Sequence, residues 1–209
     1  SPTSGINFQG TRYFYASTTL NNIAIGEGAG ENMADNRNGS DHFNVYLGYR
    51  AGQNASSTVE DGNESNNIIG YVAGENNTGS YNNILGNFAG QNNTGWSNNL
   101  IGNAGENNAG DNNNILGNSA GQNNTGDDNN ILGNSAGLNN TGTNNNLLGN
   151  SAGLNNTGSQ NNLLGNSAGL NNTGTNNNLL GFRAGLNNTG SDNNLLGNSA
   201  GLNNTGDGN

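Results

Sequence analysis

Apolar residues return at a fixed place along this chain. An apolar pair followed by glycine, as in Leu147-Leu148-Gly149, occurs eleven times, and the anchor glycines are spaced by 22, 22, 16, 16, 15, 16, 16, 16, 16 and 16 residues. Each anchor is followed by an Ala-Gly pair, and most copies continue into Asn-Asn-Thr-Gly. A fixed period of this kind indicates an array of stacked repeats.

A 16-residue unit favours strands over helices. Helical repeats need about 33 residues or more, and glycine and asparagine both disfavour helix. We expect two short strands in each repeat, "NNLL" and roughly "NSAGL". A bend at the anchor glycine separates them, and an "NNTG" turn follows, where Asn and Gly accept positive φ. The predicted fold is all-β: a narrow parallel β-solenoid, or β-roll, of about eleven rungs, roughly 50 Å long at about 4.8 Å per rung.

Stacked rungs place equivalent residues in columns. The second residue of each apolar pair forms one column, which we predict to be the core and assembly ladder: Ile25, Leu47, Ile69, Leu85, Ile101, Leu116, Leu132, Leu148, Leu164, Leu180 and Leu196. Its N-terminal neighbours form a second column, a candidate interface ladder that includes Ile115, Ile131, Leu147, Leu163, Leu179 and Leu195.

Adjacent residues of a strand point to opposite faces. One reading is therefore that one of these two columns is buried against other copies of the chain, because a long exposed apolar stripe is an association site. The other reading is that the glycine bend lets both columns enter one core.

A third column changes character along the chain. Five residues after the anchor glycine, the early repeats carry Glu or Gln, whereas the later repeats carry further candidate interface residues: Leu138, Leu154, Leu170, Leu186 and Leu202. Asparagine columns are expected to hydrogen-bond amide to amide along the stack.

The two ends of the chain differ. Residues 1–20 carry no repeat and are rich in aromatics, so we interpret them as an N-terminal cap or docking segment. Residues 21–209 form the array, with longer loops in 21–80 and regular 16-residue repeats in 81–209. The chain begins without methionine and stops inside a repeat, which suggests a processed chain or fragment whose last repeat continues into further chain or meets a neighbouring subunit.

Composition narrows the function classes. Of 209 residues only 29% are hydrophobic and 9% charged, so a conventional layered core is not expected. A formal charge of −10 has the wrong sign for a nucleic acid partner. The lack of cysteine removes disulfides and thiolate metal sites, and no apolar run reaches the roughly 20 residues of a membrane span.

The stretches "NNIAIGEGAG" at 21–30, "NVYLGYRAGQN" at 44–54 and the later "NNILGNSAGQN" resemble the head repeats of YadA-like trimeric autotransporter adhesins and related bacterial and phage fibre proteins. The resemblance covers about residues 21–209. It implies a left-handed parallel β-roll, three chains side by side, and attachment to host or matrix surfaces at the cell exterior. It also implies that the Ile25 column lies in the roll interior.

Catalytic and metal chemistry find little support. His42 is the single histidine and lies in a polar loop, and Ser151-type residues have no base near them in the sequence. Asp127 and Asp128 do not recur in a calcium-binding pattern. We expect no enzyme activity, no catalytic or metal residue and no cofactor.

Periodic glycosylation is a further hypothesis. Asn-x-Thr acceptors occur in eight of the eleven repeats, and three more triplets lie in loops. The acceptors are Asn76, Asn92, Asn123, Asn139, Asn155, Asn171, Asn187, Asn203, Asn38, Asn54 and Asn63. The triplets also arise from composition and turn chemistry alone.

These patterns predict a non-enzymatic extracellular structural protein that self-associates through apolar ladders into a fibre or fibrous adhesin, as a trimer or a head-to-tail filament. The alternative is a receptor- or glycan-binding adhesin or phage-fibre head, with the loops around His42 to Tyr49 as the contact surface. A third hypothesis is ice binding through threonine, although "TGT" occurs only at 141–143 and 173–175.

Overall fold

The computed structural model describes residues 5–8, 11–16, 21–32, 43–55 and 65–209. These residues form strands and turns without any helix. The chain falls into two compact units, residues 1–107 and 108–209. Each unit is a parallel β-solenoid, so the expected all-β solenoid of 16-residue repeats is confirmed. The boundary between the units falls in the single 15-residue repeat, a division that the sequence pattern does not predict.

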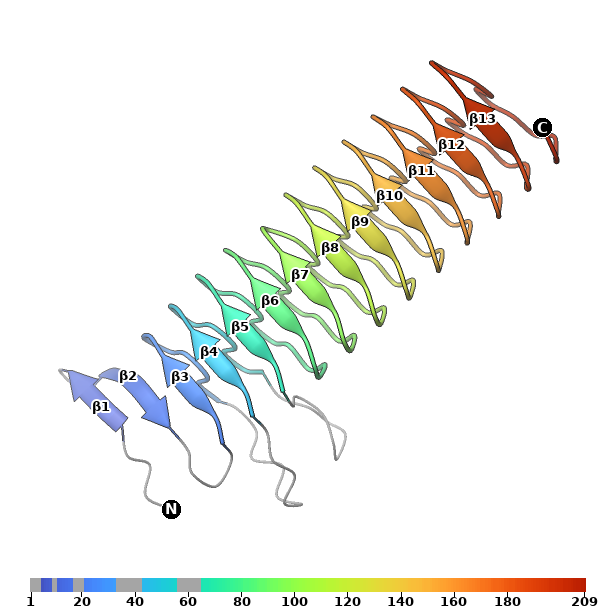
Figure 1. Cartoon of the computed structure of the whole chain (residues 1–209). Helices are drawn as coiled ribbons and strands as arrows, with labels where there is room; N and C mark the ends of the chain where they lie inside the picture. Colours follow the sequence, from blue (N-terminus) through green and yellow to red (C-terminus); the bar gives the residue numbers. More distant parts are fainter. Residues whose placement is uncertain (1–4, 9–10, 17–20, 33–42, 56–64) are drawn as a thin grey trace. The chain divides into compact units, whose positions relative to one another are not determined.

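Unit 1 begins with an antiparallel pair of strands. β1 (Gly5–Phe8) pairs with β2 (Thr11–Ala16), and β2 pairs antiparallel with β3 (Ile23–Ile25). From β3 onward the strands are parallel and in register, one per coil (Figure 1): β4 (Val45–Leu47), β5 (Asn67–Ile69), β6 (Asn83–Leu85) and β7 (Asn99–Ile101).

Unit 2 repeats the same parallel arrangement with less variation. Its strands are β8 (Asn114–Leu116), β9 (Asn130–Leu132), β10 (Asn146–Leu148), β11 (Asn162–Leu164), β12 (Asn178–Leu180) and β13 (Asn194–Leu196). Leu147 pairs with Leu163, and Leu163 with Leu179, so each residue stacks on its own equivalent 16 positions away.

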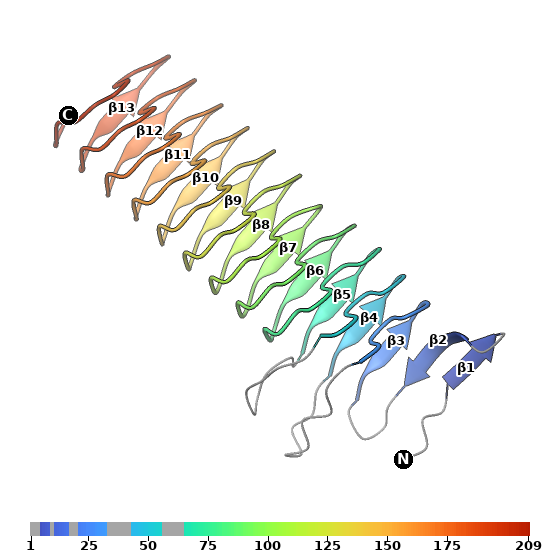
Figure 2. The same ribbon diagram turned by 180° about the vertical axis from the view of Figure 1, so that it is seen from behind.

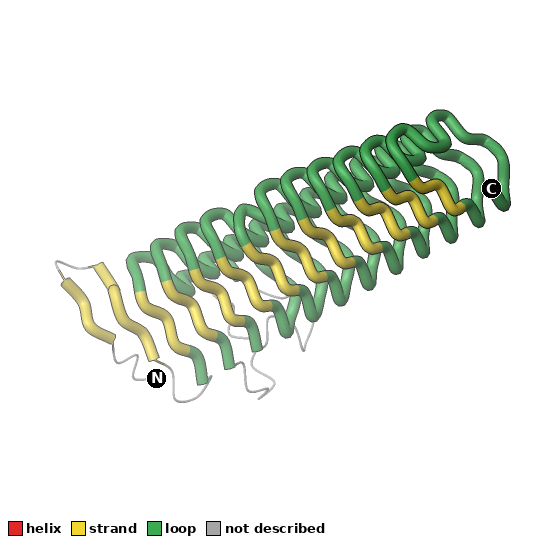
Figure 3. Tube along the Cα trace, turned by 45° about the horizontal axis from the view of Figure 1, so that its top comes forward, coloured by secondary structure: helices red, strands yellow, loops and turns green. Residues whose placement is uncertain are grey.

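Outside the strands, the described residues of the coils form turns and bends. In the coil of β10, three overlapping turns are closed by hydrogen bonds from Ala152 N–H to Gly149 O (3.3 Å), from Leu154 N–H to Ser151 O (3.3 Å) and from Asn156 N–H to Gly153 O (3.0 Å). Figures 2 and 3 show that strand occupies only one short part of each coil.

The predicted second strand, "NSAGL", is therefore wrong. Every other residue of this segment has positive φ: 135° at Gly149, 54° at Ser151, 62° at Gly153 and 56° at Asn155. A left-handed residue at the third position is what a type II turn requires, and it is incompatible with a strand.

From β4 onward, the strand of each coil places one large apolar side chain in the interior. Most coils also bury the alanine of the Ala-Gly pair and two asparagines; in the coil of β10 the buried residues are Leu147, Ala152, Asn145 and Asn156. A Cβ added at Gly153 would lie 2.7 Å from Leu147 Cδ2. The coil is therefore too thin to take in a second large side chain.

Buried asparagines bind their own copies in the neighbouring coils. Asn172 Nδ2 donates one hydrogen bond to Asn156 Oδ1 (2.9 Å) and another to Gly174 O (2.9 Å), while Asn172 Oδ1 accepts from Asn188 Nδ2 (2.8 Å). Each amide of this column thus bonds its neighbours without charge, as the sequence predicts for asparagine columns.

The glycine of the "NNTG" segment has a different role from the predicted one. Gly174 is not among the glycines with positive φ. A Cβ added there would instead lie 1.8 Å from the backbone oxygen of Gly190 in the next coil. Glycine is required because the two backbones approach each other too closely for a side chain.

We predict that Gly174→Ala destabilises unit 2 by about 3 kcal/mol or more, because neither backbone can yield to the added methyl group. The matched control is Gly206→Ala in the last coil, where the nearest atom to the added Cβ is the end of a side chain, Asn209 Nδ2, at 3.0 Å. That variant should change the free energy of unfolding by about 0.5 kcal/mol. Urea unfolding followed by circular dichroism measures both, and equal losses would refute the close-approach explanation.

We also predict that Asn172→Ala costs about 3 kcal/mol, because it removes three hydrogen bonds from a buried site: the one that Asn156 Oδ1 accepts, one of the two that Gly174 O accepts, and one of the two that Asn188 Nδ2 donates. Asn162→Ala removes an amide from an outer ladder instead, where water replaces the lost hydrogen bonds, and should cost about 1 kcal/mol. Thermal melts of the two variants compare the ladders directly. A larger loss from Asn162→Ala would contradict the assignment of the inner ladder.

Candidate functional site

The outer strand face is the most regular surface of each unit. We define it as the first and third residues of the strands β3 to β13, which lie on the side opposite the buried middle residue. In unit 2 it consists of two columns: Asn114, Asn130, Asn146, Asn162, Asn178 and Asn194 beside Leu116, Leu132, Leu148, Leu164, Leu180 and Leu196. None of these side chains carries a charge.

The predicted core ladder lies on this outer face, so its placement in the interior is wrong. Ile25 is 43% exposed, Leu132 49% and Leu196 67%. The neighbouring column, from Ala24 and Tyr46 to Leu179 and Leu195, is buried instead. The two columns do lie on opposite faces, as one of the two sequence-based readings requires. The residues Ile115, Ile131, Leu147, Leu163, Leu179 and Leu195, predicted as interface, are core.

The physical reason is the position of the bend. Leu148 is followed at once by Gly149, whose φ of 135° turns the chain before the next inward-pointing residue, Ala152. Leu147 is then the strand residue that faces Ala152 across the thin coil. Both leucines are apolar, so composition alone does not decide between them.

Asparagines bind one another along the outer strand face. Asn130 Nδ2 donates to Asn146 Oδ1 (2.9 Å), Asn146 to Asn162 (2.7 Å) and Asn162 to Asn178 (2.7 Å). Unit 1 has the same ladder from Asn67 through Asn83 to Asn99. Each amide thereby makes some of its hydrogen bonds within the protein. This lowers the free-energy cost of burying the face in a contact, where water no longer reaches the amides.

A shallow groove of about 410 Å³ runs along this face in unit 2. It lies between the two columns and is lined by Asn146, Asn162, Asn178, Leu148, Leu164 and Leu180. A row of identical side chains at the strand spacing, without charge or proline, has the properties of a surface that interdigitates with a second such row.

The third column behaves differently in the two units. In unit 1 it is polar and internally bonded: Gln53 Nε2 donates to Glu31 Oε2 (2.8 Å), and Gln91 Nε2 to Glu75 Oε2 (3.0 Å). In unit 2 the column begins with Gln122 and continues with leucines, which are half-buried apart from Leu202, which is 48% exposed. The predicted change from a polar to an apolar stripe thus takes place, and whether this stripe is an interface stays a prediction.

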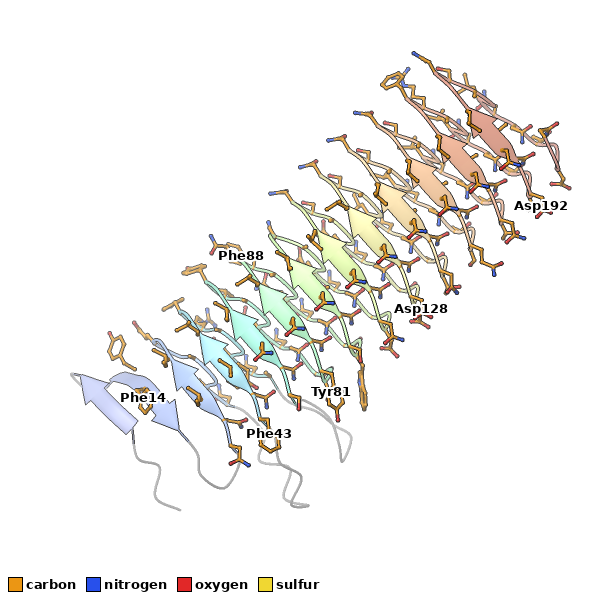
Figure 4. The ribbon with its side chains drawn as sticks, viewed as in Figure 1. Phe14, Phe43, Tyr81, Phe88, Asp128 and Asp192 are labelled. Carbon is orange, nitrogen blue, oxygen red and sulfur yellow. The ribbon has the colours of Figure 1, made fainter. Side chains whose placement is uncertain are left out.

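Exposed aromatic rings gather in unit 1. Tyr49 stacks on Tyr71 with centroids 5.2 Å apart, and Tyr71 meets Phe88 edge to face at 5.3 Å. A second pair, Tyr81 and Trp96, has centroids 6.4 Å apart. Figure 4 shows Phe88 on one edge of unit 1 and Tyr81 on the other. Their clustering follows from the stacking of successive coils, which brings residues 22, 17 and 15 positions apart in the sequence close together.

The acceptor asparagines of the Asn-x-Thr triplets form an exposed ladder of their own. Asn139 Nδ2 donates to Asn155 Oδ1 (3.0 Å), and Asn155 Nδ2 to Asn171 Oδ1 (3.0 Å), so the atom that would carry a glycan already bonds the next coil. Asn54 joins this ladder through Asn76 (3.1 Å). Asn38 and Asn63 lie outside the described residues, and glycosylation stays a prediction.

No group of three or more His, Cys, Asp or Glu side chains in the described part of the chain is placed to hold a metal ion. His42 lies outside that part, and Asp127 and Asp128 are exposed at a turn. Asp127 Oδ1 accepts a hydrogen bond from Asp111 N–H (2.8 Å). The described residues also contain no helix that is long and apolar enough to cross a membrane.

No protein-family model matches this chain, and neither a curated protein nor a solved structure matches it. The resemblance to YadA-like head repeats therefore stays a hypothesis, and the geometry of the outer strand face is the basis for the functional proposal.

Proposed function

We propose that this chain is a non-enzymatic structural protein that self-associates side by side through its outer strand face, forming a fibre or fibrous adhesin at the cell exterior. The observation that carries the proposal is the unbroken, uncharged row of outward-facing leucines beside the asparagine ladder in unit 2, of which Leu132 and Leu196 are exposed and the others half-buried. An apolar stripe of this length on a soluble surface favours association.

Charge placement supports association through this face. The acidic residues of unit 2 are Asp111, Asp127, Asp128, Asp192 and Asp207. They lie in the two residues after the "NNTG" segment, or after "NNAG" for Asp111, and are exposed there. Figure 4 shows Asp128 and Asp192 along one edge of unit 2. The outer strand face carries none of them. Two copies can thus meet through that face without bringing like charges into direct contact, and added salt should strengthen the association by screening the edges.

A second copy of the same face is the partner that fits the pattern best. Both rows repeat at the strand spacing of about 4.8 Å, so leucines of one copy can lie between leucines of the other over many coils. Two copies related by two-fold symmetry can meet through the same face on each copy. The trimer that the YadA-like resemblance implies would instead need two different contact surfaces on each chain. Sedimentation velocity, described next, also gives the number of subunits in the assembly.

We predict that Leu148→Thr, Leu164→Thr and Leu180→Thr together abolish assembly while leaving the solenoid folded, because threonine suits an exposed strand and removes the apolar row. The measurement is sedimentation velocity over a concentration series, with circular dichroism melts as the folding check. The matched control exchanges the leucines of the third column, Leu138→Thr, Leu154→Thr and Leu170→Thr. Assembly that survives the first set and fails in the second would overturn the proposed face.

The aromatic cluster of unit 1 favours a second candidate function, recognition of a receptor or glycan. Tyr49, Tyr71 and Phe88 are 40%, 48% and 41% exposed and in contact with one another. Exposed aromatic rings provide contact area with little side-chain entropy to lose on binding. Tyr49 belongs to the loop region that the sequence indicates for this role. Ice binding gains no such support, since Thr141 is exposed but Thr143 is half-buried.

We expect the combined variant Tyr49→Asn, Tyr71→Asn and Phe88→Ser to lose binding in a glycan array or to host cells and to assemble normally. The replacements are those found at the same coil positions of unit 2, Asn150 and Ser151, and Ser151 shares the positive φ of Phe88. Unchanged binding by the variant would remove the aromatic cluster from the adhesin hypothesis.

A further inference from the structure

An aromatic–arginine pair interrupts the repeat twice. Tyr49-Arg50 follows the anchor Gly48, and Phe182-Arg183 follows the anchor Gly181. Both arginines occupy the second position after the anchor and have positive φ, 53° and 55°. The two pairs therefore start from equivalent places in their coils, and their surroundings can be compared position by position.

Arg50 has carboxylate and amide partners within unit 1. Its Nη2 lies 3.0 Å from Glu75 Oε1, and its Nε donates to Gln53 Oε1. Gln53 and Glu75 are the third-column residues of the same coil and the next coil. The polar third column of unit 1 thus receives the guanidinium group.

In unit 2 the same two positions are leucines. Leu186 takes the place of Gln53, and Leu202 takes the place of Glu75. Arg183 is exposed, with its guanidinium carbon 4.9 Å from the centre of the Phe182 ring. Within the described ranges, Arg50–Glu75 is the one ion pair, so no described carboxylate is paired with Arg183.

The leucines around Arg183 form a groove of about 480 Å³ on unit 2. Leu170, Leu186 and Leu202 supply its apolar lining, with Arg183, Ser167 and Ser199 among its polar residues. Arg183 is also the only cationic residue in 108–209, against five aspartates. Arg183 thus lies at an apolar groove without the carboxylate that Arg50 has. A ligand that fits this groove combines an apolar part with a negatively charged group.

We propose that this groove binds a small amphipathic carboxylate, such as a medium-chain fatty acid. The carboxylate would take the place beside Arg183 that Glu75 has beside Arg50, and the alkyl chain would cover Leu170, Leu186 and Leu202. Arginine suits this role because its planar fork can bind both oxygens of a carboxylate. A second copy fits less well, because its acidic edge in unit 2 offers polar turns and no apolar side chains to cover the leucines.

The net charge of the chain opposes the binding of an anion. A chain of formal charge −10 attracts cations and repels anions in general. Preference for a decanoate ion over a decyltrimethylammonium ion, which has the same alkyl chain and the opposite charge, therefore requires a specific anion site. This site is independent of assembly through the outer strand face, so each proposal can fail while the other stands.

The test is equilibrium dialysis of decanoate and of decyltrimethylammonium, each below its micelle concentration, against the whole chain. We expect decanoate to bind with one site per chain and the cation to bind more weakly. Arg183→Ser, which restores the serine of the other coils, should lower the decanoate affinity about tenfold or more, because a charge-assisted hydrogen bond is lost. Arg50→Ser is the matched control and should leave decanoate binding unchanged.

A second variant supplies the partner from within the chain. Leu186→Gln with Leu202→Glu recreates the surroundings of Arg50 and should abolish decanoate binding while keeping the arginine. Equal binding of both ions, full binding by Arg183→Ser, or decanoate binding that survives in this double variant would each overturn the proposal. Binding of decanoate only by assembled material, lost in the Leu148→Thr set, would likewise overturn it and move the site to the contact between copies.

Discussion

Within each unit, the residues of one coil stack on their equivalents in the next coil at the strand spacing of about 4.8 Å. The backbone bonds between neighbouring coils, such as Leu147 strand pairing and the 2.9 Å contact from Gly153 N–H to Ala168 O, hold every position directly over its equivalent. A residue type is therefore acceptable only if it tolerates itself as a neighbour. Asparagine does so because its amide donates and accepts in one direction, leucine because it packs on leucine, and glycine because backbone comes within 2 Å of its missing side chain at Gly174. Like charges would stack and repel, which accounts for the scarcity of ionisable residues.

The repeat made the architecture predictable and left its orientation open. Period, strand content and parallel stacking follow from the spacing of the anchor glycines. The inward column did not follow, because Leu147 and Leu148 are equally apolar and alternation says only that they oppose each other. The second side of the coil was also mistaken for a strand. Glycine at 149 and 153 and asparagine at 155 share the odd positions, and this is the sequence signal for alternating left-handed residues; Ser151 between them conceals it, since serine has no preference for positive φ.

The larger changes of residue type along the array lie on the outside. The inner asparagines and alanines hardly change from coil to coil, whereas the outward positions carry aromatics in unit 1 and leucines in unit 2. The groove at Arg183 follows from this variation, because leucines stand in unit 2 where unit 1 has Gln53 and Glu75, which leaves the arginine without the carboxylate that Arg50 has. The sequence predicts the leucine stripe but not the groove. The role of Arg183 follows only from the comparison with Arg50, which the structure shows paired with Glu75.

The most direct test of the account compares the accessibility of two adjacent leucines. The chain has no cysteine, so Leu163→Cys and Leu164→Cys each introduce a single thiol for maleimide labelling without background. We predict that position 163 is protected in both dispersed and assembled protein, and that position 164 labels rapidly when dispersed and becomes protected on assembly. Rapid labelling at 163, or labelling at 164 that assembly does not slow, would contradict the assignment of the core column or of the outer strand face as the contact.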